Sequence, residues 1–327
     1  NITYNKWNLL KSNLEVYYLR KAETSLGHMK SLIKSVDYDV AYINGIYSFY
    51  FSIIPLLLLR KSSKLVIVGA RGMLNAQAFT VKPLRKLWFI RISNALGLYK
   101  QIIFHATNEE EKTEVKRRIG TQAKVKVAPN FPRRLTIEFP SKRKKLEGTV
   151  DFINVARIAK EKGTLKLIKF LSELNDGIVN LDIFGPIYDH EYWKQCLVEI
   201  EKLPKNICVS YRGVLASEKI PETLDNYHFF VMPSEGENFG HSILEGLSKG
   251  LPVLISNRTP WKNLEENQAG WDIPLKEVNQ FVEALNKCIK MNQEEYDKWS
   301  NSAFTLAKDF IENPETMEAN KELFNID

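Results

Sequence analysis

The residues best suited to chemistry lie in one segment, 232–245, with the sequence MPSEGENFGHSILE. An apolar run ends there, two glycines indicate a turn, and a helix-forming sequence follows. Free N–H groups at the start of such a helix bind anions, which predicts a phosphate site. The candidate donors are Asn238, Phe239, Gly240 and His241. Two carboxylates, Glu237 in the turn and Glu245 within the helix, predict separate roles, and Glu245 suits a ribose diol.

Short β-rich runs alternate with helix-length stretches along the chain, which is typical of parallel α/β sheets. The predicted strands are 40–43, 64–68, 102–106, 125–128, 151–155, 180–184, 207–211, 229–232 and 252–255. This order predicts two doubly wound, Rossmann-like lobes facing a cleft. The candidate turn follows a predicted strand, where such sheets bind ligands.

The length of 327 residues favours two domains. We assign residues 1–135 to a first lobe, 136–150 to a linker with a solvated basic run at 142–145, 151–312 to a second lobe, and 313–327 to a terminal helix that packs back on the first lobe. The helical spacing of Phe281, Leu285 and Ile289 continues the second lobe after its strands.

The beginning of the first lobe departs from the Rossmann pattern. Residues 1–30 contain one glycine and no GxGxxG, so we expect the chain to begin inside this lobe, which is then N-terminally truncated. The apolar run 49–59 is too short to span a bilayer and predicts a buried helix.

Charge divides unevenly: residues 1–148 hold 27 Lys/Arg and 10 Asp/Glu, whereas 149–327 hold 19 and 29. This favours a first half that faces an anionic surface, the alternative being a solvated basic face without a partner. A candidate basic amphipathic helix combines cations with apolar residues, and it either lies against anionic lipid or packs on the sheet with a charged outer face. Its residues are Lys82, Leu84, Arg85, Lys86, Leu87, Trp88, Arg91 and Ile92. Nucleic acid is not expected as a partner, because no base-stacking platform or reading motif accompanies the charge.

Metal and disulfide chemistry has little support. Cys196, Cys208 and Cys288 form no CxxC pair, which favours a reducing cytoplasm. Asp37 and Asp39 form a DxD that precedes a strand, so an ordinary turn is expected. The histidines His190, His228 and His241 have no partner at metal-ligand spacing, so surface or core positions are expected, with His241 the one worth testing.

The pattern Pro-Ser-x-x-Glu237-x-Phe-Gly-x-x-x-x-Glu245, followed by Gly250-Leu-Pro-Val, resembles the family 4 (group 1) retaining glycosyltransferases of the GT-B fold. The segments around Arg157 and Lys162, 181–185, 211–215 and 269–274 (a later turn) also resemble this family, so the resemblance covers nearly the whole chain. First-lobe segments 70–74, 105–110 and 127–130 resemble members that build capsular and lipopolysaccharide chains.

The resemblance implies roles for individual residues. Arg157 and Lys162 hold the donor diphosphate, whose charge grows as the glycosidic bond breaks. Glu237 and the 238–241 turn hold the transferred sugar, and Glu245 anchors the ribose. The remaining implied donor contacts are Gly185, Gly213, Val214 and Leu215. On the acceptor side, Asn44 stands where many members carry His, and Arg71 is the candidate contact.

The implied function is metal-independent transfer with retention from a nucleoside-diphosphate sugar, UDP favoured over GDP, with no further cofactor. The acceptor is a saccharide or polyprenyl-linked saccharide, and the reaction belongs to surface polysaccharide synthesis in the cytoplasm, with peripheral contact to the inner face of the membrane. Two alternatives remain open: a GT-B sugar-nucleotide epimerase or phosphorylase, and a non-catalytic nucleotide-sugar-binding protein.

Overall fold

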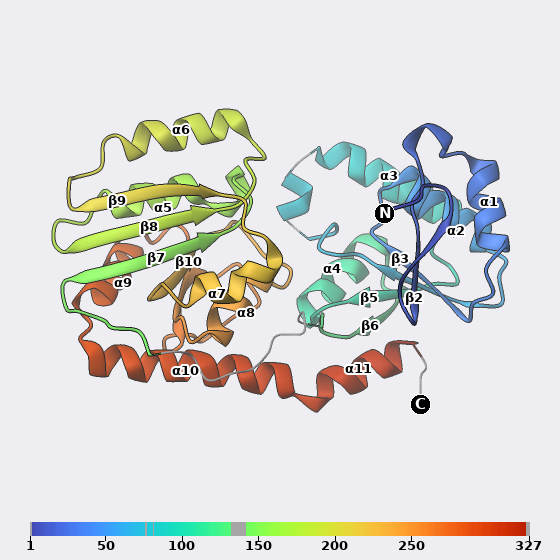
Figure 1. Ribbon diagram of the computed structural model, residues 1–327. Helices are drawn as coiled ribbons and strands as arrows, with labels where there is room; N and C mark the ends of the chain where they lie inside the picture. Colours follow the sequence, from blue (N-terminus) through green and yellow to red (C-terminus); the bar gives the residue numbers. More distant parts are fainter. Residues whose placement is uncertain (1, 76, 81, 132–141, 325–327) are drawn as a thin grey trace. The chain divides into compact units, whose positions relative to one another are not determined.

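The computed structural model describes residues 2–75, 77–80, 82–131 and 142–324 (Figure 1). The chain forms two compact units. Unit 1 comprises Asn1–Pro129 and Glu315–Asp327, and unit 2 comprises Asn130–Pro314. Of the predicted linker, residues 136–141 lie outside the described residues.

Unit 1 contains a parallel sheet whose strands follow chain order, β3-β4-β5-β6. These strands are β3 (Val40–Asn44), β4 (Leu65–Gly69), β5 (Ile103–Ala106) and β6 (Lys124–Val127). The four strands predicted in this half are confirmed to within one residue at either end. Apolar side chains on both faces of β4 are buried, which explains its continuous apolar sequence.

The helices of unit 1 cover both faces of this sheet. They are η1 (Lys21–Glu23), α1 (Leu26–Lys34), η2 (Phe49–Ile53), α2 (Ile54–Leu59), η3 (Gln77–Thr80), α3 (Pro83–Ala95), α4 (Glu109–Ile119) and α11 (Pro314–Phe324). Helices α2, α3 and α4 share one hydrophobic core, into which Leu56, Ile90 and Val115 pack. Helix α11 covers the other face through Leu323, and its Phe324 ring lies 5.8 Å from the ring of Tyr42.

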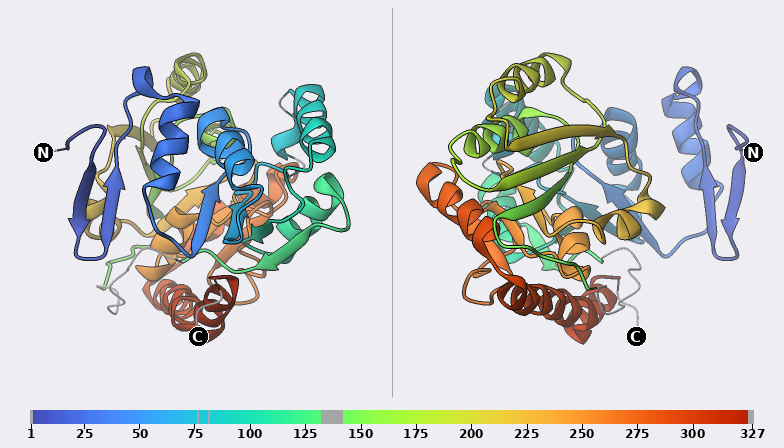
Figure 2. Two further views of the ribbon diagram at one scale, coloured as in Figure 1. Left: turned by 90° about the vertical axis from the view of Figure 1, so that its right-hand side faces the viewer. Right: turned by 60° about the vertical axis from the view of Figure 1, so that its left-hand side comes forward.

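An antiparallel hairpin of β1 (Trp7–Lys11) and β2 (Leu14–Tyr17) precedes this sheet and was not predicted. Figure 2 shows it beside α1. Most of its side chains are exposed, so its sequence lacks the alternation of apolar and polar residues by which a half-buried strand is found.

The expectation of a buried helix over 49–59 is only half right. The segment is helical, as η2 followed by α2, and Ile54 and Leu56 are buried. Phe49, Phe51 and Leu57 are exposed, because a helix on one face of a sheet buries only one of its own sides.

Unit 2 contains a six-stranded sheet in the order β12-β11-β10-β7-β8-β9, in which all neighbours are parallel. The order of β9, β8, β7 and β10 can be followed in Figure 1. The strands are β7 (Thr149–Val155), β8 (Ile178–Phe184), β9 (Ile207–Gly213), β10 (Phe229–Met232), β11 (Val253–Ser256) and β12 (Gly270–Ile273). The first five match predicted strands.

Two cores flank the unit 2 sheet, and β10 contributes to both in alternation. Phe229 and Val231 belong to one core, whereas Phe230 and Met232 belong to the other. Burial on both faces explains why all four residues are apolar. The helices that cover the sheet are η4 (Lys160–Lys162), α5 (Thr164–Leu171), α6 (His190–Ile200), η5 (Ser217–Lys219), α7 (Ile220–Leu224), α8 (His241–Ser248), α9 (Val278–Lys290) and α10 (Gln293–Glu312).

The predicted turn at 269–274 is wrong, because the segment forms the edge strand β12. Gly270 allows this close pairing: its φ is +143°, and a Cβ there would lie 2.0 Å from the carbonyl oxygen of Val253. The expected helix through Phe281, Leu285 and Ile289 is confirmed as α9, with all three side chains buried.

The expectation of a solvated basic run at 142–145 is also wrong for two of its residues. Arg143 and Lys145 are buried, whereas Lys142 and Lys144 are exposed. The extended segment lies against unit 2, and the Arg143 guanidinium donates to the carbonyl oxygen of Lys249 at 2.7 Å and forms an ion pair with Asp225.

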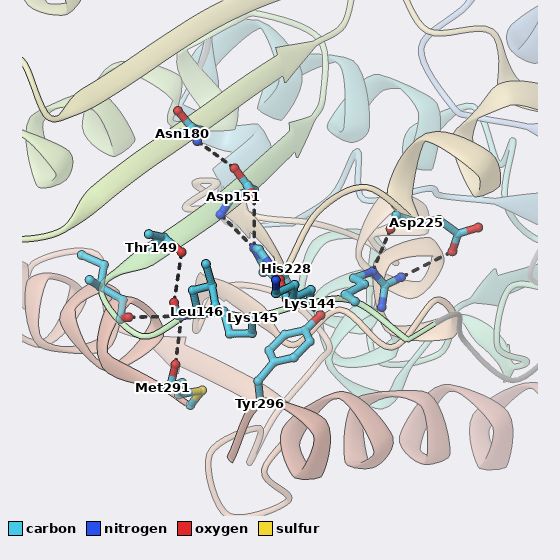
Figure 3. A network of polar contacts seen from close by, with 12 residues as sticks. Lys144, Lys145, Leu146, Thr149, Asp151, Asn180, Asp225, His228, Met291 and Tyr296 are labelled. Atoms are coloured by element: carbon cyan, nitrogen blue, oxygen red, sulfur yellow. Dashed lines mark hydrogen bonds and ion pairs between the residues drawn. The ribbon is translucent and has the colours of Figure 1, made fainter. Parts of the chain in front are cut away.

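The buried ammonium of Lys145 is fully paired with backbone oxygen. Its Nζ donates to the carbonyl oxygens of Leu146, Ile289 and Met291 at 3.0, 3.1 and 2.9 Å. Figure 3 shows this cluster beside the contact between His228 and Asp151. These three acceptors replace the water that the Lys145 ammonium loses on burial, and they attach the segment 142–145 to α9.

Candidate active site

The strand order of unit 2 places a topological switch point between β7 and β10. From β7 the chain proceeds through β8 to β9 and then returns to β10 on the other side of β7. The loops that leave the carboxyl ends of these two strands therefore diverge, and open α/β sheets bind ligands in the crevice this creates. Arg157 follows β7, and Glu237 follows β10.

Glycines bring the loops around this edge into close contact. Gly185 has a φ of +143°, and a Cβ there would lie 1.9 Å from the carbonyl oxygen of Ala156. Gly163 has a φ of +76°, and a Cβ there would lie 2.0 Å from the carbonyl oxygen of Pro233. Only glycine permits either approach, so the loops after β7, β8 and β10 are held against one another.

The two predicted cations differ in their surroundings. The Arg157 guanidinium is half-exposed, contacts the Glu161 carboxylate at 2.7 Å, and lies 5.3 Å from the centre of the Tyr188 ring. Lys162 is more enclosed, and its Nζ donates to both oxygens of Glu237 at 2.6 and 2.9 Å. The sequence-predicted pair Lys162 and Glu237, one from each loop, is thus joined directly.

A second carboxylate, Glu235, extends this charge network and was not predicted. Its side chain pairs with Lys166 and with Arg258, the latter at 2.6 Å. Its backbone N–H donates to the carbonyl oxygen of Glu161 at 2.7 Å. Alternating charges across the two loops fix their positions before any ligand arrives, and the contacts are non-local, so no spacing in the sequence indicates them.

Helix α8 begins at His241, with Gly240 as its N-cap at a φ of +77°. Phe239 is buried against the His241 ring at 4.5 Å, and its carbonyl oxygen accepts from Trp261 Nε1 at 2.8 Å. The four predicted residues 238–241 therefore form the entry of α8, as expected. Glu245 is buried one turn inside this helix.

The predicted nucleobase segment follows β9. Gly213 has a φ of +81°, Val214 is largely exposed and Leu215 packs on the core. The carbonyl oxygen of Gly213 accepts from the Gly185 N–H at 2.8 Å, and Tyr211 Oη donates to the carbonyl oxygen of Gly185 at 2.9 Å. These two hydrogen bonds hold the backbone at the carboxyl ends of β8 and β9 together.

In unit 1 the structure brings the two predicted acceptor-side residues together. Arg71 Nε donates to Asn44 Oδ1 at 3.0 Å, and the guanidinium lies 5.7 Å from the centre of the Tyr42 ring. Tyr42 Oη contacts His105 Nδ1 at 2.7 Å, and His105 Nε2 contacts the carbonyl oxygen of Ala128 at 2.7 Å. Burial lowers the pKa of His105, which favours the neutral imidazole.

A carboxylate that sequence reasoning missed supports this loop. Glu111 is buried, and its Oε1 accepts from the Gly72 N–H at 2.6 Å while its Oε2 accepts from the N–H and hydroxyl of Thr107 at 2.8 Å. Arg71 itself adopts a left-handed φ of +51°. Glu111 stands among three consecutive glutamates at the start of α4, so its sequence suggests only a favourable helix start.

Candidate metal ligands do not gather in the part of the chain that the structure describes, where no group of three or more His, Cys, Asp or Glu is placed to hold an ion. His228 is a buried residue whose Nδ1 accepts from the Asp151 N–H. The DxD residues Asp37 and Asp39 are exposed and pair loosely with Lys64. Among the described helices, none is long and apolar enough to cross a membrane.

The family model of the group 1 glycosyl transferases matches residues 136–305, more than half of the chain. The chain therefore belongs to the group 1 glycosyl transferases. Over 104 residues it is 29% identical to the sulfoquinovosyl transferase SQD2 of Arabidopsis thaliana, a match that covers 32% of this chain and 19% of that protein.

Solved structures show the same fold. Sucrose-phosphate synthase from Thermosynechococcus elongatus superposes with a TM-score of 0.71 at 14% identity, covering 94% of this chain and 80% of that one. Anabaena HepE, in complex with UDP and glucose, gives 0.67 at 15% identity, covering 91% and 80%. These likenesses confirm the predicted α/β, GT-B fold.

Proposed function

We propose that the protein is a retaining glycosyltransferase that moves a sugar from a nucleoside-diphosphate donor to a saccharide or lipid-linked acceptor. The observation that carries the proposal is the charge pattern at the switch point, where Lys162 pairs with Glu237 and Arg157, on the same loop as Lys162, pairs with Glu161. A departing diphosphate gains negative charge as its bond to the sugar breaks, and cations already fixed in place stabilise it without reorganisation.

In this proposal the remaining predicted residues of unit 2 bind the rest of the donor. Glu245 accepts from the ribose hydroxyls, the entry of α8 holds the transferred sugar, and the backbone of 213–215 contacts the base. UDP is the favoured nucleotide of the donor because HepE, which shares the fold, is solved with UDP. In this proposal Arg157 and Lys162 supply the positive charge opposite the diphosphate.

The proposed reaction balances without a further reactant. The bond between the anomeric carbon and the diphosphate oxygen breaks, and the acceptor oxygen bonds to that carbon on the same face. The acceptor proton passes to the departing phosphate oxygen, which holds the growing negative charge. The protein's contribution is therefore positional and electrostatic.

On the acceptor side we propose Asn44 and Arg71, which hydrogen-bond to each other at the end of β3. The expected setting is surface polysaccharide synthesis at the inner face of the cytoplasmic membrane. It is supported by the first-lobe motifs that resemble capsular and lipopolysaccharide enzymes, and by Cys196, Cys208 and Cys288, which are all free thiols.

The test is product analysis with UDP-glucose, UDP-N-acetylglucosamine and GDP-mannose, each with a polyprenyl-linked sugar as acceptor. We expect transfer from one donor with the anomeric configuration retained by NMR, at a rate unchanged by EDTA and strongly reduced in Arg157→Ala. An epimerised donor, or release of sugar phosphate with inorganic phosphate present, would replace the proposal by the epimerase or phosphorylase alternative. Donor binding without turnover would indicate a binding protein.

A further inference from the structure

Helix α3 exposes a row of large apolar side chains on its outer side. Leu84, Trp88, Ile92 and Leu96 follow one another at intervals of four residues and are 71, 60, 55 and 51% exposed. The inner side of α3 packs on the sheet through Ile90 and the buried Ser93. Residues four apart lie on one side of a helix, so the row forms a strip about 18 Å long.

The outward side of α3 is mixed, because Lys82, Arg85 and Arg91 are exposed together with the apolar row. Arg85 is exposed beside the row, and the Arg91 guanidinium lies 5.8 Å from the centre of the Trp88 ring. Within the described residues, no carboxylate forms an ion pair with Lys82, Arg85 or Arg91.

The charge of the surrounding segment is entirely positive. From position 40 to position 108 the chain contains nine Lys and Arg and no Asp or Glu. This segment forms β3, η2, α2, β4, α3 and β5, so the bias belongs to a continuous part of unit 1. A positively charged segment attracts an anionic surface and repels a copy of itself.

We propose that the apolar row of α3 is a docking surface for an anionic lipid membrane, with Lys82, Arg85 and Arg91 contacting the headgroups. A helix with a row of Leu, Trp and Ile flanked by Lys and Arg lies in the plane of the interface with its apolar side inserted. The arginine and lysine stems reach past the apolar row, which places their charges at headgroup level. A second copy is the weaker occupant, because no carboxylate in 40–108 could pair with the cations of the facing copy.

This docking surface extends the proposed function, because a lipid-linked acceptor is confined to the membrane surface. It does not depend on that function, since lipid binding needs neither donor nor catalysis. Donor binding by unit 2 is therefore measured on every variant, so a failure of docking and a failure of the proposed function give different results.

The test is co-sedimentation of the full chain with vesicles of phosphatidylcholine alone and with vesicles that also contain phosphatidylglycerol. We expect binding to the anionic vesicles only. The double variant Arg85→Gln, Arg91→Gln lowers the partition coefficient about 30-fold. The triple variant Leu84→Ser, Trp88→Ser, Ile92→Ser lowers it about 100-fold or more. Because these side chains are exposed, folding is preserved, and the far-UV spectrum checks it.

The matched control replaces comparably exposed residues of unit 2, as Ile178→Ser, Val198→Ser and Lys205→Gln, and leaves vesicle binding unchanged. A second readout is quenching of tryptophan emission by brominated lipid, which Trp88→Leu should abolish while preserving binding. Equal binding of the triple variant and the unchanged chain would overturn the proposal. So would the absence of binding to anionic vesicles, or a dimer in sedimentation equilibrium that the triple variant abolishes.

Discussion

Replacing Glu237 by Gln tests whether the Glu237 carboxylate competes with the donor diphosphate for Lys162. Lys162 donates to both carboxylate oxygens at 2.6 and 2.9 Å, and the two side chains are only 19 and 11% exposed. A hydrogen bond to a charged group contributes about 1.5–3 kcal/mol. Lys162 must loosen this attachment to turn to a diphosphate, so the carboxylate competes with the ligand.

We therefore expect opposite effects on the binding of a nucleoside diphosphate that carries no sugar. Glu237→Gln removes the competing charge and tightens binding about 10-fold, which is about 1.4 kcal/mol. Lys162→Gln removes the cation and weakens binding about 10- to 100-fold, in line with the loss of one charge-assisted contact. Sugar transfer falls in both variants, because Glu237 is proposed to hold the transferred sugar.

The assay is titration calorimetry with UDP and GDP, combined with the kcat of transfer. The matched control is Glu235→Gln, which removes a carboxylate of the same network that pairs with Lys166 and Arg258 but not with Lys162. It should leave the dissociation constant within about twofold. If Glu237→Gln weakened diphosphate binding as much as Lys162→Gln, the competition argument would be refuted, and Glu237 would act on the nucleotide itself.

Three further predictions concern stability, each measured by urea unfolding. Lys145→Met removes one donor from each of three carbonyl oxygens, of which those of Leu146 and Ile289 keep donors in Thr149 and Gly148. It should lower the free energy of unfolding by about 1–3 kcal/mol, whereas Lys144→Met on the exposed neighbour changes it by less than about 0.5. Gly163→Ala combines a left-handed φ with a clash against the carbonyl oxygen of Pro233. Gly148 also has a left-handed φ, +81°, but the space around it is open, so Gly148→Ala should cost only about 1–2 kcal/mol. Gly163→Ala should cost several kcal/mol more, and equal losses would contradict the packing. Burial lowers the pKa of His105, so below pH 6.5 the unfolded chain takes up a proton that the folded chain does not; the free energy of unfolding should fall as the pH drops through 6.5, and the slope should be smaller in His105→Gln.

The sequence predicts those strands whose burial leaves a continuous apolar run. β10 is recognisable because each of its four side chains enters a core, and the loop after it is recognisable because two glycines and a helix start follow. The hairpin β1–β2 is mostly exposed and leaves no such pattern, and β12 begins with a glycine that suggests a turn. The hairpin is missed because it is exposed, whereas β12 is mostly buried and is missed because of its glycine.

Some residues of the candidate site are indicated by the local sequence, whereas others are brought to the site only by folding. Arg157, Lys162 and Glu237 are found from sequence because their motifs resemble those of the family and lie in the loops that leave β7 and β10. Tyr188, which lies beside Arg157, and Glu235, which pairs with Lys166 and Arg258, reach the site only through the close approach of three loops, so spacing along the chain does not reveal them. Buried cations are missed for a related reason, since Lys145 is compensated by carbonyl oxygens of α9, which lies more than 130 residues further along the chain.

A nucleotide-sugar donor site at the switch point of unit 2 can be tested by calorimetric titration of the unliganded protein with UDP, GDP, ADP and CMP. We expect micromolar binding of one nucleoside diphosphate, reduced about 10-fold or more in both Arg157→Ala and Glu245→Ala. Absence of binding by all four nucleotides, or binding that neither variant weakens, would contradict a donor site formed by these residues.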